Sequence, residues 1–370
     1  MVNNFGIKNK FGFGCMRLPM KGADIDIEQT KKMVDEFIAA GNNYFDTAHG
    51  YIGGKSELAV KACLTDRYPR EKYLLTDKLT GVYFKKQEDI RPFFESQLKA
   101  CGVDYFDVYL MHAQNKELFS FFKKCRAYET ALELKAEGKI KHFGISFHDT
   151  ADVLEQILSE YPQIEVVQIQ YNYLDYEDPA VQSKKLYNVC EKYNKPVFIM
   201  EPIKGGSLVN LPQDALAEVR KSSDAPAELA LRFAAAPKNV IAVLSGMSAI
   251  EQMRDNLRTM SSLRELSQAE WDATVAVRTV LKSKNMIPCT ACRYCIDGCP
   301  KRISIPDLFA CLNAKKHFND WNADYYYESV YTKHNGKASE CIKCGKCEKV
   351  CPQKLPIRDL LVSVAKEFEN

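Results

Sequence analysis

The sequence predicts an α/β protein, a (β/α)8 barrel followed by a small cysteine-rich domain. Eight short apolar runs of β type are separated by helix-period segments over roughly 270 residues, the rhythm of eight βα units. The chain also has 14 cysteines, and those after residue 288 stand mostly in two tight motifs. We therefore expect the barrel at residues 1–281 and the second domain at residues 282–370.

The predicted strands can be placed in chain order. They are FGFGCMRL from Phe11, NYFDTA from Asn43, YLLTDKL from Tyr73, YFDVYLMH from Tyr105, KHFGIS from Lys141, VVQIQYNY from Val166, PVFIMEP from Pro196 and VIAVLSG from Val240. Amphipathic helices lie between them. The helix from Ile27 is expected to stop at Gly41, and the helix from Glu88 at Gly102, because glycine readily forms the left-handed C-cap.

A doubly wound sheet is the main alternative to the barrel. The one glycine-rich candidate, Gly12-Phe13-Gly14, lacks the third glycine and the later acidic partner of a dinucleotide fingerprint. This absence favours the barrel.

Composition and charge exclude several function classes. The net charge of +3 is too small to indicate a nucleic-acid partner. No apolar run approaches 18 residues, and the N-terminal sequence lacks a hydrophobic signal segment, so we expect no membrane partner and no secretion.

The distribution of the cysteines indicates metal ligation in a reducing, cytoplasmic environment rather than a disulfide scaffold. A secreted disulfide scaffold would be short and would have cysteines throughout its length. Six cysteines are instead scattered singly and are expected to be buried as small hydrophobic residues: Cys15, Cys63, Cys101, Cys125, Cys190 and Cys311.

The other eight cysteines form two copies of one motif. Both copies read C-x2-C-x2-C-x3-C-P, the bacterial-ferredoxin spacing for [4Fe–4S] clusters. Structural zinc sites are the alternative, but the third regularly spaced cysteine and the CP pair in both copies favour iron–sulfur clusters. The first motif has Cys289, Cys292, Cys295 and Cys299, and the second has Cys341, Cys344, Cys347 and Cys351.

Doubling of the motif predicts two clusters that exchange their fourth ligands. Cys351 would complete the first cluster, and Cys299 the second. Clusters with negative charge would account for the 15 Lys and Arg against 10 Asp and Glu in residues 281–370. Electron transfer is expected, a purely structural role is the alternative, and an anaerobic or low-oxygen organism would suit such clusters.

Polar residues at the predicted strand ends indicate a reductase site, since barrel enzymes carry their catalytic residues there. Asp46, Lys78 and His112 end three successive strands, and Tyr51 follows Asp46. Hydride reduction of a carbonyl leaves an alkoxide that needs a proton, and an ordinary tyrosine is a poor acid at neutral pH. A buried Lys78, kept charged by Asp46, would lower the pKa of Tyr51. His112 would donate a hydrogen bond to the substrate oxygen.

At these residues the chain resembles the aldo-keto reductase family. FDTAHGYIGGKSE, LLTDKL and DVYLMHA resemble its signatures, and Asp46, Tyr51, Lys78 and His112 match its catalytic tetrad. The resemblance covers roughly residues 5–280 and, with the tail, is similar to a ferredoxin-fused subgroup. It implies an NAD(P)-dependent oxidoreductase acting on a small carbonyl or alcohol.

The resemblance also implies which residues bind the nucleotide. Ser146 and Gln168 match the positions that hold the nicotinamide amide. Met200 replaces the usual aromatic platform, and Phe147 replaces a familiar asparagine. Phosphate and adenosine contacts are expected from the loops after the last two strands, at Lys204, Gly205, Gly206, Gly246, Gln252 and Asn256. Gly246 and Gln252 stand where basic residues often bind a 2′-phosphate, so NADH and a flavin remain alternatives to NADPH.

The sequence therefore supports three hypotheses. The first is an NAD(P)H-dependent carbonyl reductase or alcohol dehydrogenase, with Tyr51 as general acid and two clusters that exchange electrons with a ferredoxin-type partner. The second is a ferredoxin-coupled reductase in which cluster electrons reach the substrate directly or through a flavin. The third is a non-catalytic electron-transfer module. The complete tetrad favours the first.

Overall fold

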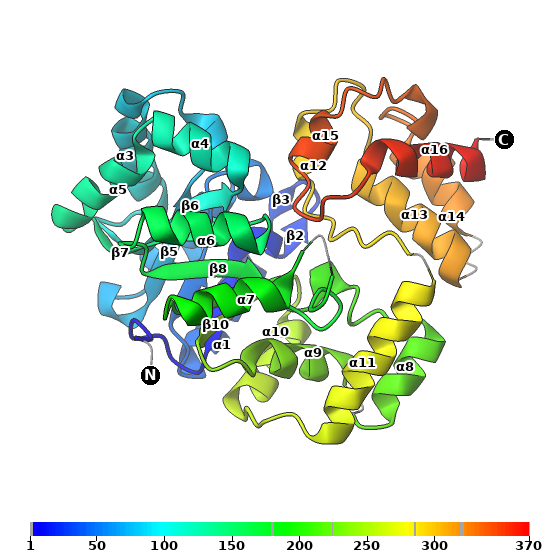
Figure 1. Ribbon diagram of the computed structural model, residues 1–370, viewed down its shortest axis with the longest axis horizontal. Coiled ribbons are helices and arrows are strands. Elements are labelled where there is room, and N and C mark those ends of the chain that lie inside the picture. The colour runs from blue at the N-terminus through cyan, green and yellow to red at the C-terminus, as the bar shows by residue number, and fades with distance from the viewer. Residues whose placement is uncertain (1–2, 179–180, 224, 285, 319–321, 370) are drawn as a thin grey trace. The chain divides into compact units, whose positions relative to one another are not determined.

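Eight parallel strands close into a barrel, as the sequence predicts (Figure 1). The computed structural model describes residues 3–178, 181–223, 225–284, 286–318 and 322–369. The strands follow one another around the barrel in chain order, which excludes the doubly wound alternative. They are β1 (Phe11–Gly14), β4 (Tyr44–Asp46), β5 (Leu74–Leu79), β6 (Phe106–Gln114), β7 (Ile140–Phe147), β8 (Val166–Gln170), β9 (Val197–Met200) and β10 (Val240–Gly246). β2 (Met20–Lys21) and β3 (Asp24–Ile25) form a small separate hairpin.

Helices connect the strands, and local signals define their ends. The side chain of Asp26 accepts a hydrogen bond from the backbone N–H of Gln29 and caps α1. Gly102 ends α3 with a left-handed φ of 68°, as predicted. The helices of this part are α1 (Ile27–Ala39), α2 (Ser56–Val60), α3 (Ile90–Cys101), α4 (Lys116–Lys124), α5 (Ala127–Ala136), α6 (Ala151–Glu160), α7 (Ser183–Lys192), α8 (Gln213–Arg220), α9 (Pro226–Ala235), α10 (Ile250–Ser261) and α11 (Gln268–Ser283).

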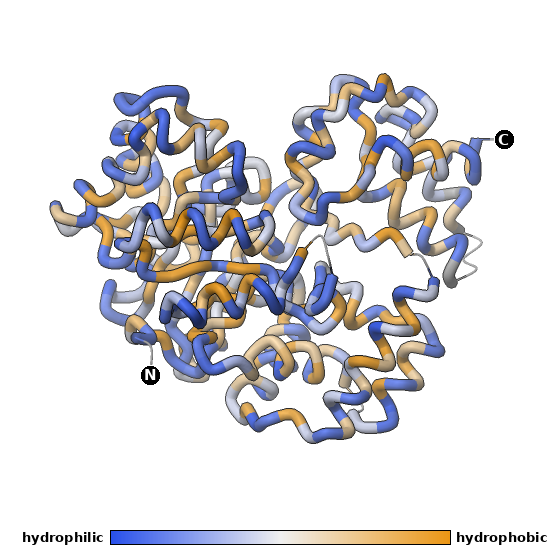
Figure 2. The backbone as a smooth tube through the Cα atoms, viewed as in Figure 1, coloured by the Kyte–Doolittle hydropathy of each residue, from blue (hydrophilic) through white to orange (hydrophobic). Residues whose placement is uncertain are grey.

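The barrel strands are almost wholly buried, and hydrophobic residues make up most of their length (Figure 2). One buried cluster consists mainly of strand residues, namely Tyr44, Val108, Leu110, Val166, Phe198, Ile241, Ala242 and Leu244, together with Ile7. Gly12 on β1 leaves room for the ring of Tyr44, since a Cβ atom at Gly12 would lie 2.7 Å from that ring. The barrel is thus a filled core, and its chemistry must lie at the strand ends.

The chain divides into two compact units. The first comprises Met1–Pro202 and Ala230–Leu266, and contains all eight barrel strands. The second comprises Ile203–Leu229 and Ser267–Asn370. This division differs from the boundary expected after residue 281, because α8 packs against α11 and both belong to the second unit.

The cysteine-rich end of the second unit is an internal repeat. The short helix α12 (Tyr294–Asp297) precedes α13 (Ile305–Phe318) as α15 (Lys346–Lys349) precedes α16 (Ile357–Phe368), with α14 (Asn322–Tyr325) between the copies. The copies share backbone conformation as well as sequence. Their matching left-handed positions are Ala291 and Lys343, Arg293 and Gly345, and Arg302 and Lys354.

No helix in the described ranges is both long enough and apolar enough to cross a lipid bilayer.

Candidate functional site

The strand register brings the predicted polar residues to one end of the barrel. Gly14, which ends β1, pairs with Asp46 of β4, and Lys78 of β5 pairs with Leu110 of β6. Ser146 of β7 lies directly opposite Gln168 of β8. Because the strands are parallel, these residues all stand at the carboxyl ends, where barrel enzymes place their active sites.

Lys78 and Asp46 form a buried ion pair. The Nζ atom of Lys78 lies 2.6 Å from Oδ1 of Asp46 and 2.7 Å from the carbonyl oxygen of Thr47. Gln168 donates a hydrogen bond of 3.2 Å to the other carboxylate oxygen of Asp46. Burial raises the pKa of Asp46, while Lys78 and Gln168 oppose that rise. The pair therefore places a desolvated ammonium inside the barrel end.

Tyr51 lies against this ammonium. It begins a short turn in which Ile52 and Gly53 adopt left-handed φ values of 52° and 61°. The Nζ atom of Lys78 is 4.8 Å from the centroid of the Tyr51 ring. The net shift of the Tyr51 pKa is upward, whereas a lowered pKa was expected. Burial raises that pKa well above its ordinary value, and the Asp46 charge raises it further. Tyr51 is consequently a protonated phenol at neutral pH.

His112 reaches the same place through a bulge in β6. The pairing of β6 with β7 shifts register between Met111 and Gln114, so His112 and Ala113 are the bulged residues. The ring centroids of Tyr51 and His112 are 6.0 Å apart. Burial lowers the pKa of His112 well below its ordinary value, and the Lys78 charge adds to the effect. His112 is thus a neutral imidazole, which can donate a hydrogen bond from one ring nitrogen.

Thr80 fixes the orientation of the His112 ring, a contact that the sequence did not predict. Its hydroxyl lies 2.7 Å from Nδ1 of His112. The structure therefore brings together all four residues of the predicted tetrad and supplies one supporting hydroxyl.

The two residues expected at the nicotinamide amide are buried side by side. The Oγ atom of Ser146 accepts a hydrogen bond of 2.7 Å from the backbone N–H of Ala113, whose φ of 54° is left-handed. Gln168 is held by Asp46, as described above. The chemistry of this pair fits a carboxamide, since a hydroxyl and a side-chain amide can each donate and accept hydrogen bonds. Met200 ends β9 half-buried, and Phe147 is buried.

Two of the three residues expected at the phosphates have other contacts. Lys204, Gly205 and Gly206 belong to the second unit. The Nζ atom of Lys204, which is 1% exposed, donates a hydrogen bond of 2.6 Å to Oε1 of Gln353. Gly205 has a φ of 63°, and a Cβ atom there would lie 2.4 Å from the Thr290 carbonyl oxygen. These contacts account for a buried lysine and a glycine without a phosphate.

The residues expected at the adenosine end differ in exposure. Asn256 is buried and donates a hydrogen bond of 3.0 Å to Ser245 of β10. Gln252 is exposed and accepts a hydrogen bond of 2.8 Å from the backbone N–H of Ser248. Gly246, at the end of β10, is half-buried. Asn256 thus supports the barrel, whereas Gln252 shapes the loop.

Arg17 is a basic residue at this site that the sequence reasoning missed. A Cβ atom at Gly246 would lie 3.1 Å from three carbon atoms of the Arg17 side chain, so the glycine lets Arg17 cover the end of β10. The guanidinium lies 3.5 Å from a carboxylate oxygen of Glu201, just after β9. The sequence gives only an indirect indication of this position. Arg17 follows β1 in sequence, and only closure of the barrel brings β1 beside β10.

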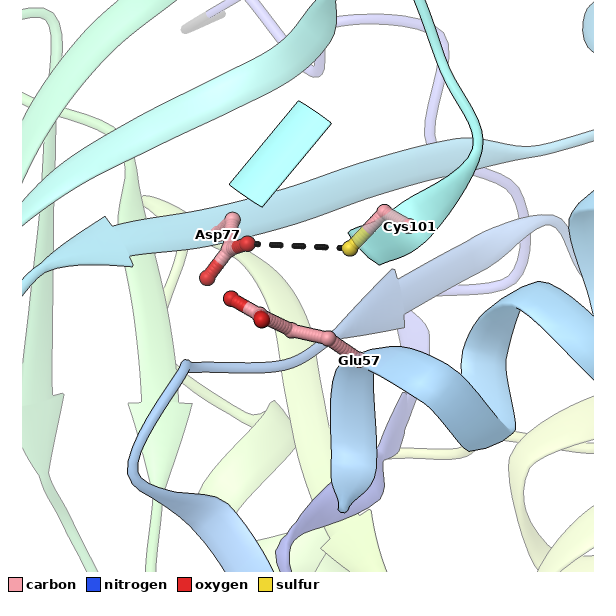
Figure 3. A group of neighbouring side chains, drawn as sticks. All are labelled: Glu57, Asp77 and Cys101. Carbon is pink, nitrogen blue, oxygen red and sulfur yellow. Dashed lines mark hydrogen bonds between the residues drawn. The ribbon is translucent and has the colours of Figure 1, made fainter. Parts of the chain in front are cut away.

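A second buried polar cluster lies between β5, α2 and α3 (Figure 3). Asp77 and Glu57 face each other, and the Cys101 thiol donates a hydrogen bond of 3.7 Å to Asp77. Burial raises the pKa of Glu57 to about 7, and burial with the Glu57 charge raises that of Asp77. Gln97 and His49 also bond Glu57, at 3.2 and 2.8 Å. With these raised pKa values, the two carboxyls can share a proton near neutral pH.

The eight motif cysteines line two cavities in the second unit. The lining of the first cavity includes Cys289, Cys292, Cys295 and Cys351. The lining of the second includes Cys299, Cys341, Cys344 and Cys347. Each cavity takes three cysteines from one motif and the fourth from the other, which is the exchanged grouping that the sequence predicts.

Four thiols around one cavity could hold either a single zinc ion or a four-iron cluster. Thiolate ligands of one tetrahedral zinc lie about 3.8 Å apart, given Zn–S distances of about 2.3 Å. A four-iron cube separates its thiolates more widely, and the C-x2-C-x2-C-x3-C-P spacing of both motifs favours the cube. Backbone N–H groups of Ala291 and Ile303 donate to Cys289 and Cys299.

Two family models match the chain. The model of the "Aldo/keto reductase family" matches residues 10–278, and that of the "4Fe-4S dicluster domain" matches residues 288–355. The first match covers the barrel and its strand-end residues, and the second covers both cysteine motifs.

Similar known proteins cover about the same part of the chain. The "NADH-specific methylglyoxal reductase" of Escherichia coli is 25% identical over 316 residues, which cover 72% of this chain and 93% of that protein. "L-galactose dehydrogenase" of Arabidopsis thaliana is 24% identical, over 72% of this chain and 88% of its own. The holo form of aldo-keto reductase AKR11C1 from Bacillus halodurans superposes with a TM-score of 0.59 at 24% identity, covering 72% of this chain and 91% of its own.

Proposed function

The chain belongs to the aldo/keto reductase family and ends in a 4Fe-4S dicluster domain, and from these facts we propose that it reduces a small carbonyl compound, or oxidises the corresponding alcohol, with Tyr51 as the acid. The main support for this proposal is the contact of the Tyr51 ring with the buried Lys78 ammonium, which is itself paired with Asp46. In a barrel that needed only stability, a desolvated ion pair facing a buried phenol would be a poor choice.

The proposed chemistry assigns one task to each residue. The Tyr51 hydroxyl gives its proton to the carbonyl oxygen as that oxygen gains negative charge. The phenolate that forms is stabilised by Lys78. The lysine is already charged and paired with Asp46 before the reaction begins. His112, neutral and held by Thr80, donates a hydrogen bond to the same substrate oxygen. The carbonyl carbon gains a hydride, and the oxygen gains the proton.

We propose that a nicotinamide nucleotide supplies the hydride when it is bound. Ser146 and Gln168 would hold its carboxamide, and Arg17, at the end of β10, would meet its phosphates in place of Lys204. NADH is favoured over NADPH for two reasons. The positions expected to bind a 2′-phosphate are Gly246 and Gln252, and the E. coli relative is named for its specificity for NADH.

The cysteine cavities would hold two [4Fe–4S] clusters that exchange electrons with a one-electron carrier of ferredoxin type. Support comes from the grouping of four thiols around each cavity and from the N–H groups that point at Cys289 and Cys299. Carbonyl reduction by the tetrad needs no cluster. The clusters would therefore connect a two-electron site to a one-electron partner.

The test is an anaerobic assay of the cluster-loaded protein with NADH and then NADPH, using methylglyoxal as the carbonyl probe. Oxidation of the nucleotide that depends on the carbonyl is expected, faster with NADH, and Tyr51→Phe should lower it by at least about 10²-fold. Tyr51→Phe should leave the iron content and the nucleotide affinity unchanged. Full activity in that variant would refute the acid role, and a bound flavin spectrum in the wild-type protein would replace the nucleotide hypothesis.

A further inference from the structure

Lys204 is a buried cation in the cysteine-rich unit. The segment Ile203–Leu229 belongs to that unit, and Lys204 is 1% exposed. Its Nζ atom donates to Oε1 of Gln353, which lines the first cavity two residues after Cys351. The ammonium is therefore directed at the wall of the first cavity.

The neighbouring backbone is fixed against the same wall. Gly205 approaches the carbonyl of Thr290 so closely that any Cβ atom would collide with it. Thr290 follows Cys289 and also lines the first cavity. The hydrogen bond and the backbone packing thus both place Lys204 beside this group of thiols.

The internal repeat shows what Lys204 replaces. Lys301 follows Cys299-Pro300 and lines the second cavity, where it is exposed. The equivalent residue in the other copy, after Cys351-Pro352, is Gln353. Gln353 carries no charge but binds the ammonium of Lys204. Each cavity therefore has a lysine at its CP corner, supplied by the motif itself in one case and by a distant segment in the other.

We propose that Lys204 is a positioning residue for the first cluster. Its buried charge makes one-electron reduction of that cluster more favourable. This proposal rests on the proposed cluster ligation at Cys289, Cys292, Cys295 and Cys351. Reduction adds one negative charge to a cluster that is already negative. A cation held in a low-dielectric wall stabilises the reduced state more than the oxidised state. The exposed Lys301 is screened by water and ions and has a smaller effect on the second cluster.

The experiment is an anaerobic reductive titration with dithionite, followed by EPR and by visible absorbance of the cluster-loaded protein. Lys204→Gln removes the charge, and Lys204→Arg keeps it. The first variant should make reduction of the first cluster less favourable by on the order of tenfold, while the second should stay near the wild-type potential. Cys289→Ser identifies which of the two reduction steps belongs to the first cluster.

Two controls separate this role from a structural or nucleotide-binding one. Lys301→Gln is the matched loss of charge at the second cavity and should shift that potential much less. If the Lys204→Gln variant does not assemble its clusters, Lys204→Met is used instead, because its uncharged side chain has a similar length. An unchanged first potential in an assembled, uncharged variant would overturn the proposal, as would equal shifts of both clusters. A rise in the Michaelis constant for the nucleotide without a shift in the cluster potential would also overturn the proposal and would favour a phosphate-binding role for Lys204. The cluster potential can be measured whether or not Tyr51 is the acid.

Discussion

The ammonium of Lys78 lies 2.6 Å from Oδ1 of Asp46, and the two side chains are only 0% and 4% exposed. The energetic consequence of such a pair is asymmetric. Two desolvated charges that satisfy each other contribute little net stability, whereas one charge left alone is strongly unfavourable. This relationship allows the ion pair's contribution to stability to be separated from its contribution to catalysis.

Lys78→Met should destabilise the folded barrel by about 3–5 kcal/mol, because the Asp46 carboxylate loses its partner inside the protein. The double variant Lys78→Met/Asp46→Asn should regain most of that loss but none of the activity. Anaerobic thermal unfolding of the single and double variants, with parallel activity assays, measures both effects. Lys55→Met is the matched control, since Lys55 pairs with Asp24 at the surface and should change stability by less than about 1 kcal/mol. Recovery of activity in the double variant would show that the lysine is structural only.

The carbonyl-reducing rate should be flat from about pH 6 to pH 9. Reduction needs Tyr51 protonated, and a raised pKa keeps the proton on the phenol until well above its ordinary pKa of about 10. It also needs His112 neutral, and a lowered pKa keeps the imidazole uncharged down to pH values well below 6.5. The pH profile of kcat/KM for the carbonyl probe checks this. A fall centred near pH 7 would contradict both shifts and would point to another titrating group.

Asp77→Asn should stabilise the protein more at pH 8 than at pH 5. The buried carboxyls of Asp77 and Glu57 have raised pKa values, so the folded state binds more protons than the unfolded chain between about pH 4 and pH 7. Stability therefore falls as the pH rises through that window. An amide at position 77 can donate to an ionised Glu57 while still accepting the backbone N–H of Lys78. The gain at pH 8 should be about 1–3 kcal/mol, measured by thermal unfolding at the two pH values. Asp66→Asn, at the surface, should show no such difference.

The sequence was sufficient to predict the barrel, the convergence of Asp46, Tyr51, Lys78 and His112, and the exchanged grouping of the cysteines. Strand ends such as Asp46 and Lys78 can be located because apolar runs mark the strands, and parallel strands share one carboxyl end. The cysteine grouping was predictable because the spacing of the motif is itself the constraint.

The sequence was not sufficient where a contact depends on packing between distant segments. Lys204 was expected at a phosphate because it follows a barrel strand, but its side chain turns to Gln353, 149 residues later. Arg17 was missed because its place beside Gly246 requires closure of the barrel. The pKa of Tyr51 was expected to be lowered, but desolvation and the Asp46 charge raise it, and only the structure shows how deeply the ring is buried.

Arg17→Leu should raise the Michaelis constant for NADH by about 10- to 100-fold with a smaller change in kcat, because the proposed phosphate contact is charge-assisted and distant from the transferred hydride. The Michaelis constant of Arg17→Lys for NADH should lie between that of Arg17→Leu and that of the wild-type protein. Steady-state kinetics with varied NADH measures the effect. If kcat fell with no change in that constant, Arg17 would act on the substrate and not on the nucleotide.

Cys351→Ala should abolish the same cluster as Cys292→Ala, although the two residues belong to different motifs. Both line the first cavity, whereas Cys299 lines the second. Each alanine removes one of four thiolates, so the cluster at that cavity should fail to assemble while the other is retained. Iron analysis should give about half the wild-type content in all three variants. The EPR signal that remains after reduction should be the same in Cys351→Ala and Cys292→Ala and different in Cys299→Ala. If Cys351→Ala matched Cys299→Ala instead, the ligands would not be exchanged in the way that the cavities indicate.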